Sequence, residues 1–157
     1  MPRVSRSTVL LVQQARDDSG RMYAEFLRHH RFVTIVATDV GEALKLAPEA
    51  DVLVTGILLS GDVDGIELIS RLRADPRTAH MPIVVVTACA WPSARRRAEA
   101  AGCNAFLTKP CLPETLLHEV QRALAASKVR RARPRASTGN AEVPASGVSK
   151  RRPKQPA

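Results

Sequence analysis

The amino-acid sequence predicts a doubly wound α/β fold, in which helices cover both faces of a parallel sheet. Five short apolar segments recur along the chain, and helical patterns lie between them. The segments are continuous runs rich in Val, Ile and Leu, which is typical of strands buried on both faces. Strands that alternate with helices favour a parallel sheet. The five expected strands are Thr8–Val12, Val33–Ala37, Val52–Thr55, Ile83–Thr87 and Ala105–Thr108.

Five helical patterns follow these strands in order, each with apolar residues three or four positions apart that should face the core. Asp75 and Pro76 should end the third helix and Gly102 the fourth, while Pro113 suits the first turn of the last. Helix by helix, the apolar residues are Met22, Phe26 and Leu27; Ala43, Leu44 and Ala47; Ile66, Ile69 and Leu72; Ala94, Ala98 and Ala101; and Leu116, Leu117, Val120 and Leu124.

The length and composition fit one soluble domain with extra sequence. A chain of 157 residues can bury one substantial core, and with 45% hydrophobic but only 3% aromatic residues that core should be mostly aliphatic. No apolar run approaches the roughly 20 residues needed to cross a membrane. The apolar run Val9–Val12 is too short for a signal peptide. We therefore expect a cytoplasmic protein without membrane contact.

The charge is divided unevenly along the chain. Residues 1–127 hold 15 Lys and Arg against 14 Asp and Glu, whereas residues 128–157 hold nine against one. The last segment is also rich in Pro, Ser, Gly and Ala, so it should remain disordered because it buries too little apolar surface to offset its ordering entropy. We expect a short N-terminal extension at residues 1–7, a domain at 8–126 and a disordered basic tail at 127–157.

The basic tail has two possible roles. Its clustered cations can bind phosphate backbones through counterion release, without reading base sequence. Alternatively, the tail is a solubilising extension without a dedicated partner. It contains no aromatic residue on which a base could stack. The candidate contacts are Arg130, Arg131, Arg133, Arg135, Lys150, Arg151 and Arg152.

Gln13, Gly56, Thr87 and Lys109 fall at or just after the carboxyl ends of four expected strands, where sites form in doubly wound sheets. Together with the segments around them, they resemble the receiver domain of bacterial two-component response regulators, over roughly residues 8–126. The matching segments are Val9-Leu10-Leu11-Val12-Gln13-Gln14, Asp64-Gly65, Thr87-Ala88 and Lys109-Pro110. The resemblance implies a five-stranded, flavodoxin-like sheet.

The resemblance also identifies what this chain lacks. In the family, an aspartate that ends the third strand accepts a phosphoryl group, and an acidic pair after the first strand helps to hold Mg²⁺. Here Gly56 stands at the acceptor position, and Gln13 and Gln14 at the acidic pair. We expect the phosphoacceptor and the Mg²⁺ site to be lost and no cofactor to be used. Lys109 would then be the only charged group in the pocket.

The remaining family positions are retained. Thr87, Phe106 and Lys109 match the hydroxyl, the aromatic residue and the lysine that respond to the phosphoryl group in working receivers. The surface formed by the fourth strand, fourth helix and fifth strand, where Phe106 lies, is where relatives commonly signal.

Nearby residues allow two interpretations each. Asp17 and Asp18 suit the entrance of the first helix, where a cap is the ordinary role and a displaced metal ligand the alternative. Trp91 lies in the loop before the fourth helix, either as loop packing or as an anchor for a partner. The three cysteines lack metal-ligand spacing, so we expect no metal site.

The sequence therefore predicts a stand-alone pseudo-receiver, that is, a receiver-like module that signals without Asp phosphorylation and is not an enzyme. It should act through contacts with a histidine kinase, another response regulator or an output protein. One alternative is a nucleic-acid-associated adaptor that uses the basic tail. Another is a sensor that holds an anion or small ligand in the pocket at Lys109.

Overall fold

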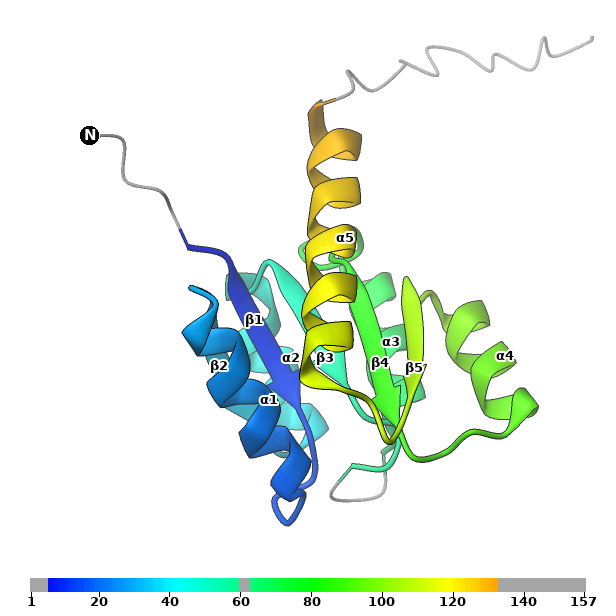
Figure 1. The fold of residues 1–157 in the computed structure, drawn as a ribbon. Coiled ribbons are helices and arrows are strands. Elements are labelled where there is room, and N and C mark those ends of the chain that lie inside the picture. The colour runs from blue at the N-terminus through cyan, green and yellow to red at the C-terminus, as the bar shows by residue number, and fades with distance from the viewer. Residues whose placement is uncertain (1–5, 60–62, 133–157) are drawn as a thin grey trace, which may run out of the picture.

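A five-stranded sheet, in which every strand runs parallel to its neighbours, forms the centre of the computed structural model (Figure 1). The structure describes residues 6–59 and 63–132. The strands lie in the order β2-β1-β3-β4-β5, which confirms the doubly wound fold. They have the bounds predicted from the sequence: β1 Thr8–Val12, β2 Val33–Ala37, β3 Val52–Thr55, β4 Ile83–Thr87 and β5 Ala105–Thr108.

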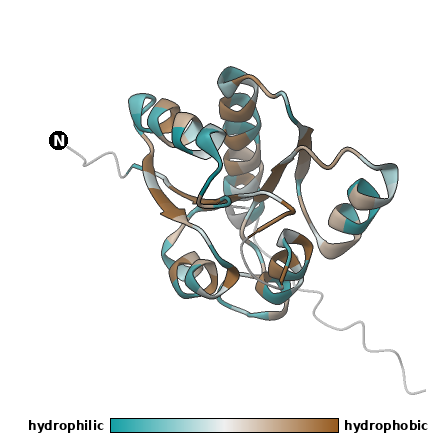
Figure 2. Cartoon of the chain, turned by 90° about the horizontal axis from the view of Figure 1, so that it is seen from below, coloured by the Kyte–Doolittle hydropathy of each residue, from teal (hydrophilic) through white to brown (hydrophobic). Residues whose placement is uncertain are grey.

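Helices cover both faces of the sheet, as Figure 1 and the view from below in Figure 2 show. Helices α1 and α5 lie on one face, and α2, α3 and α4 lie on the other. None of the helices in the described ranges combines the length and hydropathy that a membrane crossing requires. Their bounds are α1 Asp18–His29, α2 Val40–Leu46, α3 Gly65–Ala74, α4 Pro92–Ala101 and α5 Pro113–Ala132, with a 3₁₀ turn η1 at Ala47–Glu49.

Each face of the sheet builds its own apolar layer. Along β1, Val9 and Leu11 pack towards α1 and α5, while Leu10 and Val12 pack towards α2 and α3. This alternation follows from the two-residue period of a strand. Burying a side chain of this size contributes about 1.5–3 kcal/mol. A strand buried on both faces therefore needs a continuous apolar run, which explains why the sequence located the strands so well.

The helix ends follow local chemistry. Asp17, Asp39 and Asp64 are the N-caps of α1, α2 and α3, and each side chain accepts a hydrogen bond from a backbone N–H in the first turn. Helix α4 ends at Gly102, whose φ of 116° lies in the left-handed region that favours glycine. Pro113 begins α5 as predicted.

The predicted apolar face of α1 is wrong at one position. Met22 is 43% exposed, whereas Tyr23 is buried with Ala24 and Leu27. The Tyr23 hydroxyl donates a 2.7 Å hydrogen bond to the Cys111 carbonyl, so the ring can enter the core with its polar end satisfied. Apolarity alone favours Met22 over Tyr23 as the residue of α1 that faces the core.

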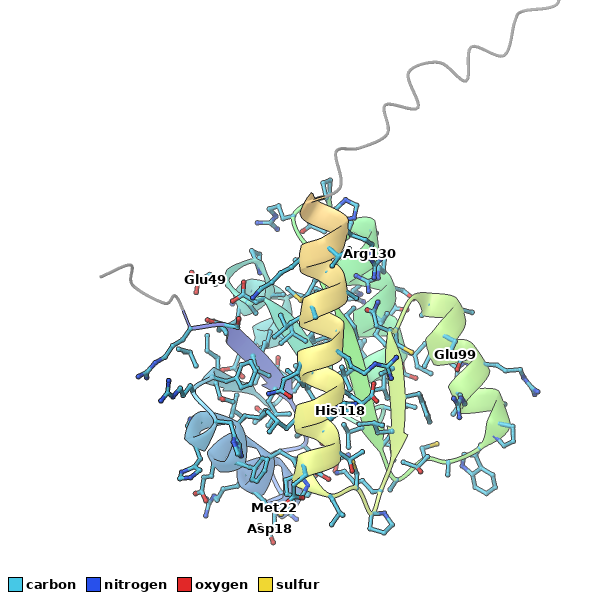
Figure 3. The ribbon with its side chains drawn as sticks, turned by 45° about the horizontal axis from the view of Figure 1, so that its top comes forward. Asp18, Met22, Glu49, Glu99, His118 and Arg130 are labelled. Carbon is cyan, nitrogen blue, oxygen red and sulfur yellow. The ribbon has the colours of Figure 1, made fainter. Side chains whose placement is uncertain are left out.

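Helix α5 is longer than the predicted domain. It continues to Ala132, so residues 127–132, including Arg130, form helix rather than the start of a disordered tail. Lys128 and Arg130 are exposed on this extension. In Figure 3, Arg130 lies near the far end of α5, while Asp18 and Met22 lie at the opposite end of the molecule. The predicted tail contacts Arg133, Arg135, Lys150, Arg151 and Arg152 lie outside the described residues.

Candidate functional site

The carboxyl ends of the strands converge on one cavity. The strand arrowheads in Figure 1 point to the lower edge of the sheet, where the chain leaves β1, β3, β4 and β5. Backbone hydrogen bonds fix this register, including 3.0 Å from Gly56 N to Val12 O and 2.9 Å from Lys109 N to Thr87 O. The cavity has a volume of about 120 Å³ and is lined by Gln13, Gln14, Asp17, Gly56, Ile57, Leu58, Val86, Thr87, Ala88 and Lys109.

Lys109 is paired with a carboxylate, contrary to the expectation that it would be the only charged group in the pocket. Its Nζ lies 2.6 Å from Asp17 Oδ2 and 2.8 Å from Ser19 Oγ. Asp17 Oδ1 also accepts hydrogen bonds from the Ser19 hydroxyl and backbone N–H. The N-cap of α1 therefore supplies the counter-ion of the lysine at the end of β5, and the pair is close to neutral.

The Asp17 carboxylate is stabilised in its charged form. Burial opposes its ionisation, but hydrogen bonds from Lys109 and Ser19, together with the charge of Lys109, outweigh burial and lower the pKa of Asp17 below its ordinary 3.8. The Asp17 carboxylate therefore stays charged at neutral pH, and the ion pair is lost as pH falls through the lowered pKa of Asp17. Both side chains are mostly buried, so salt screens this pair less than an exposed one.

Gln13 fills the space beside Gly56. Its side chain is only 4% exposed, and its Oε1 lies 3.3 Å from the position that a Cβ on residue 56 would occupy. On its other side, a Cβ on Gly20 would lie 3.1 Å from Gln13 Cβ. The Gln13 side chain thus lies between two glycines, with Gly20 near its Cβ and Cγ and Gly56 near its amide oxygen. Its Nε2 is buried without a hydrogen-bond partner among the described residues.

The other predicted switch residues divide between two places. Thr87 is buried at the cavity wall, where its hydroxyl accepts a 3.1 Å hydrogen bond from Cys89 N and so stabilises its own loop. Phe106 is half-buried on β5, and the lining of the cavity, taken over the described residues, does not include it. The Arg95 guanidinium carbon lies 5.9 Å from the centre of its ring, which is cation–π distance.

The residues present do not fit a magnesium ion. Mg²⁺ prefers charged oxygen ligands in octahedral geometry, usually with one or two carboxylates. Among the described residues that line the cavity, Asp17 is the only carboxylate, and Lys109 and Ser19 already occupy its oxygens. Within residues 6–59 and 63–132, no three His, Cys, Asp or Glu side chains are grouped as a metal site would require.

Sequence reasoning missed two features of this edge. The first is the partnership of Asp17 with Lys109, because only the capping role of Asp17 is visible locally. The second is a neighbouring cavity of about 290 Å³ beside α1, which shares Gln13, Gln14 and Asp17 with the first and reaches Arg28 and Thr38. The glycine at position 20 was the available signal, since it leaves room for the buried amide.

Comparison with known proteins gives one consistent family. The model of the response regulator receiver domain matches residues 9–121. The polar-differentiation response regulator DivK of Brucella anthropi is 30% identical over 103 residues, which cover 64% of this chain and 83% of DivK. The phosphate regulon transcriptional regulatory protein PhoB of Rhizobium meliloti is 36% identical over 101 residues, which cover 64% of this chain but only 42% of PhoB.

A solved structure supports the same relationship. The chemotaxis protein CheY4 of Vibrio cholerae superposes with a TM-score of 0.69 at 27% identity, and the match covers 76% of this chain and 99% of CheY4. The shared region ends before the end of α5 in the family match. The similarity therefore concerns the sheet, its helices and the cavity at the strand ends.

Proposed function

We propose, from the premise that this chain belongs to the response regulator receiver family of two-component signalling, that it is a pseudo-receiver. In this proposal it signals through protein contacts, without phosphorylation of an aspartate and without Mg²⁺. Its partner would be a histidine kinase, another response regulator or an output protein. That it works as a stand-alone unit stays a prediction.

One observation supports this proposal: the lysine of the pocket already has a carboxylate partner. Lys109 binds the N-cap Asp17 at 2.6 Å, while Gly56 provides no nucleophile and Gln13 occupies the space beside it. A working receiver needs an aspartate to attack phosphorus and cations to neutralise the transferring group. The one carboxylate among the described lining residues caps a helix and holds the lysine, so neither chemical role is filled.

The pairing also weighs against the anion sensor. A buried cation attracts an anion strongly only while its charge is uncompensated. Asp17 compensates Lys109, so an anionic ligand would have to displace a 2.6 Å ion pair that a serine hydroxyl supports.

The nucleic-acid alternative rests on Lys128 and Arg130 at the end of α5 and on residues beyond 132. Salt-dependent DNA binding that survives deletion of residues 133–157 would count against the role of the tail.

Phosphorylation can be tested by mass. The protein is incubated with acetyl phosphate and Mg²⁺, and its intact mass is compared with that of an untreated sample. We expect no base-labile phosphoryl adduct on the natural chain, and little gain from Gly56→Asp alone because the metal ligands would still be neutral. The triple change Gln13→Asp, Gln14→Asp and Gly56→Asp serves as the positive control. An adduct on the natural chain would overturn the proposal.

A further inference from the structure

The three most exposed large apolar side chains of the described residues lie on three neighbouring loops. Among the described residues, Leu58 is 66% exposed, and Trp91 and Leu112 are each 69% exposed. They lie in the loops that follow β3, β4 and β5, which are adjacent strands of the sheet. Because parallel strands end at the same edge, these three loops share one edge of the molecule. We call this set of three residues the apolar rim.

Trp91 has no evident structural role where it stands. It occupies the residue before α4, a position that favours Ser, Thr, Asp or Asn, and its side chain makes no capping hydrogen bond. The N-caps of α1, α2 and α3 are all aspartates that do make such bonds. A large aromatic residue left in water at this position adds nothing to the core.

Cations stand next to the tryptophan. Helix α4 begins at Pro92 and carries Arg95, Arg96 and Arg97 against a single acid, Glu99. Arg95 pairs with Glu99 and lies over Phe106, and Arg97 lies 3.8 Å from Asp64. Arg96 is exposed and forms no ion pair with another described residue. The helix therefore presents a net positive charge beside an exposed tryptophan.

We infer that the apolar rim and the arginines of α4 bind an acidic amphipathic segment of a partner protein. Trp and Arg are the residues that most often supply binding energy at protein interfaces. The partner would place apolar side chains on Trp91 and its neighbours, and carboxylates near Arg96. Leu58 and Leu112 favour a protein over a nucleic acid, since aliphatic side chains offer a base neither stacking nor hydrogen bonds. This inference rests on the proposed function and names the chemistry of its partner.

The single tryptophan of the chain makes the test direct. The full chain is titrated with a peptide made of Glu, Leu and Ala in a helical amphipathic pattern, while the Trp91 emission is followed. We expect a saturable change below about 1 mM peptide. A matched peptide with Gln in place of each Glu should bind about tenfold more weakly, and added salt should weaken the binding of the acidic peptide. No emission change up to about 1 mM would overturn the inference.

Variants assign the contacts by the anisotropy of a labelled peptide. Trp91→Ala should weaken binding at least about tenfold and Arg96→Gln about threefold. Val129→Ala and Arg71→Gln, which change an exposed apolar residue and an exposed arginine elsewhere, should leave binding unchanged. If the two control variants lose as much peptide affinity as Trp91→Ala and Arg96→Gln, the assignment of the contacts to Trp91 and α4 is overturned.

Two further arms separate the alternatives. An oligothymidylate of about ten nucleotides should bind more weakly than the peptide, and tighter binding that Trp91→Ala abolishes would identify a nucleic-acid site instead. The phosphorylation assay does not depend on the binding of the peptide or of the oligothymidylate. If the peptide does not bind and no phosphoryl adduct forms, the docking inference fails while the pseudo-receiver proposal stands.

Discussion

Two cations join distant segments at opposite edges of the sheet, and they are satisfied in different ways. At the amino edge, Arg73 donates five hydrogen bonds to neutral acceptors: the carbonyls of Ala79, Met81 and Gly102, and Asn104 Oδ1. At the carboxyl edge, Lys109 binds a single carboxylate and one hydroxyl. Arg73 uses all the donors of its guanidinium, whereas Lys109 has two partners, of which only Asp17 is charged.

The difference separates a structural edge from an edge with unused binding capacity. Around Arg73, one side chain ties the end of α3 to the end of α4 and to the segment before β4. At the carboxyl edge, the Gln13 amide nitrogen is buried without a partner in the described part of the chain, and Trp91 is exposed. Sequences usually depart from locally favourable choices where function requires it. The carboxyl edge is therefore where we place the contacts of this protein.

The largest effect is expected at the structural edge. Arg73→Ala removes five hydrogen bonds and leaves partly buried carbonyls unpaired, so it should lower the free energy of unfolding by about 4 kcal/mol. Arg73→Lys should recover less than half of this loss, because an ammonium cannot reach acceptors arranged around a planar guanidinium. Urea denaturation measures both variants. A loss below about 1 kcal/mol for Arg73→Ala would show that the comparison between the edges is wrong.

The carboxyl edge should be rigid at one backbone position. A Cβ on Gly65 would lie 1.9 Å from the carbonyl oxygen of Gly56, and neither backbone can yield easily. Gly65→Ala should therefore cost about 3 kcal/mol of stability. In Gly56→Ala the nearest atom is Gln13 Oε1 at 3.3 Å, so the cost should stay below about 1 kcal/mol. Equal costs in thermal or urea denaturation would mean that the loop after β3 adjusts freely.

The ion pair at the cavity gives a smaller, pH-dependent effect. Asp17→Asn keeps a good N-cap but removes the charge that faces Lys109, so it should cost about 1 kcal/mol at neutral pH. The pKa of Asp17 is lowered in the folded state, so its contribution is complete above the ordinary value of 3.8 and disappears as pH falls through the folded value. The stabilities of natural and variant chains should therefore converge in acid. A difference that stays constant with pH would show that the ion pair contributes nothing.

The smallest effect has the opposite sign. Gln13→Met replaces a buried amide, whose Nε2 has no partner within residues 6–59 and 63–132, with an apolar side chain of similar length. Removing an unsatisfied polar group is neutral or favourable, so the free energy of unfolding should stay the same or rise by about 1 kcal/mol. Gln14→Met, at a more exposed neighbouring position, is the matched control and should change little. A large loss for Gln13→Met alone would indicate that the amide forms hydrogen bonds in solution.

The sequence alone determined the strand bounds and several helix ends of this protein. Runs such as Val52–Thr55 and Ile83–Thr87, which are apolar up to a final threonine, located the strands, because burial on both faces favours apolar side chains. Gly102 and Pro113 fixed helix ends through their own backbone preferences. Each of these features depends only on neighbours along the chain.

Tertiary structure decided the charge of the cavity and the buried face of α1. Asp17 and Lys109 are 92 positions apart, so no local pattern reveals their ion pair. Tyr23, and not Met22, enters the core because the Cys111 carbonyl, in the loop after β5, accepts a hydrogen bond from the Tyr23 hydroxyl. Gln13 fits because two distant glycines leave it space. Pairing and packing of this kind depend on which segments the fold brings together, and local periodicity does not contain that information.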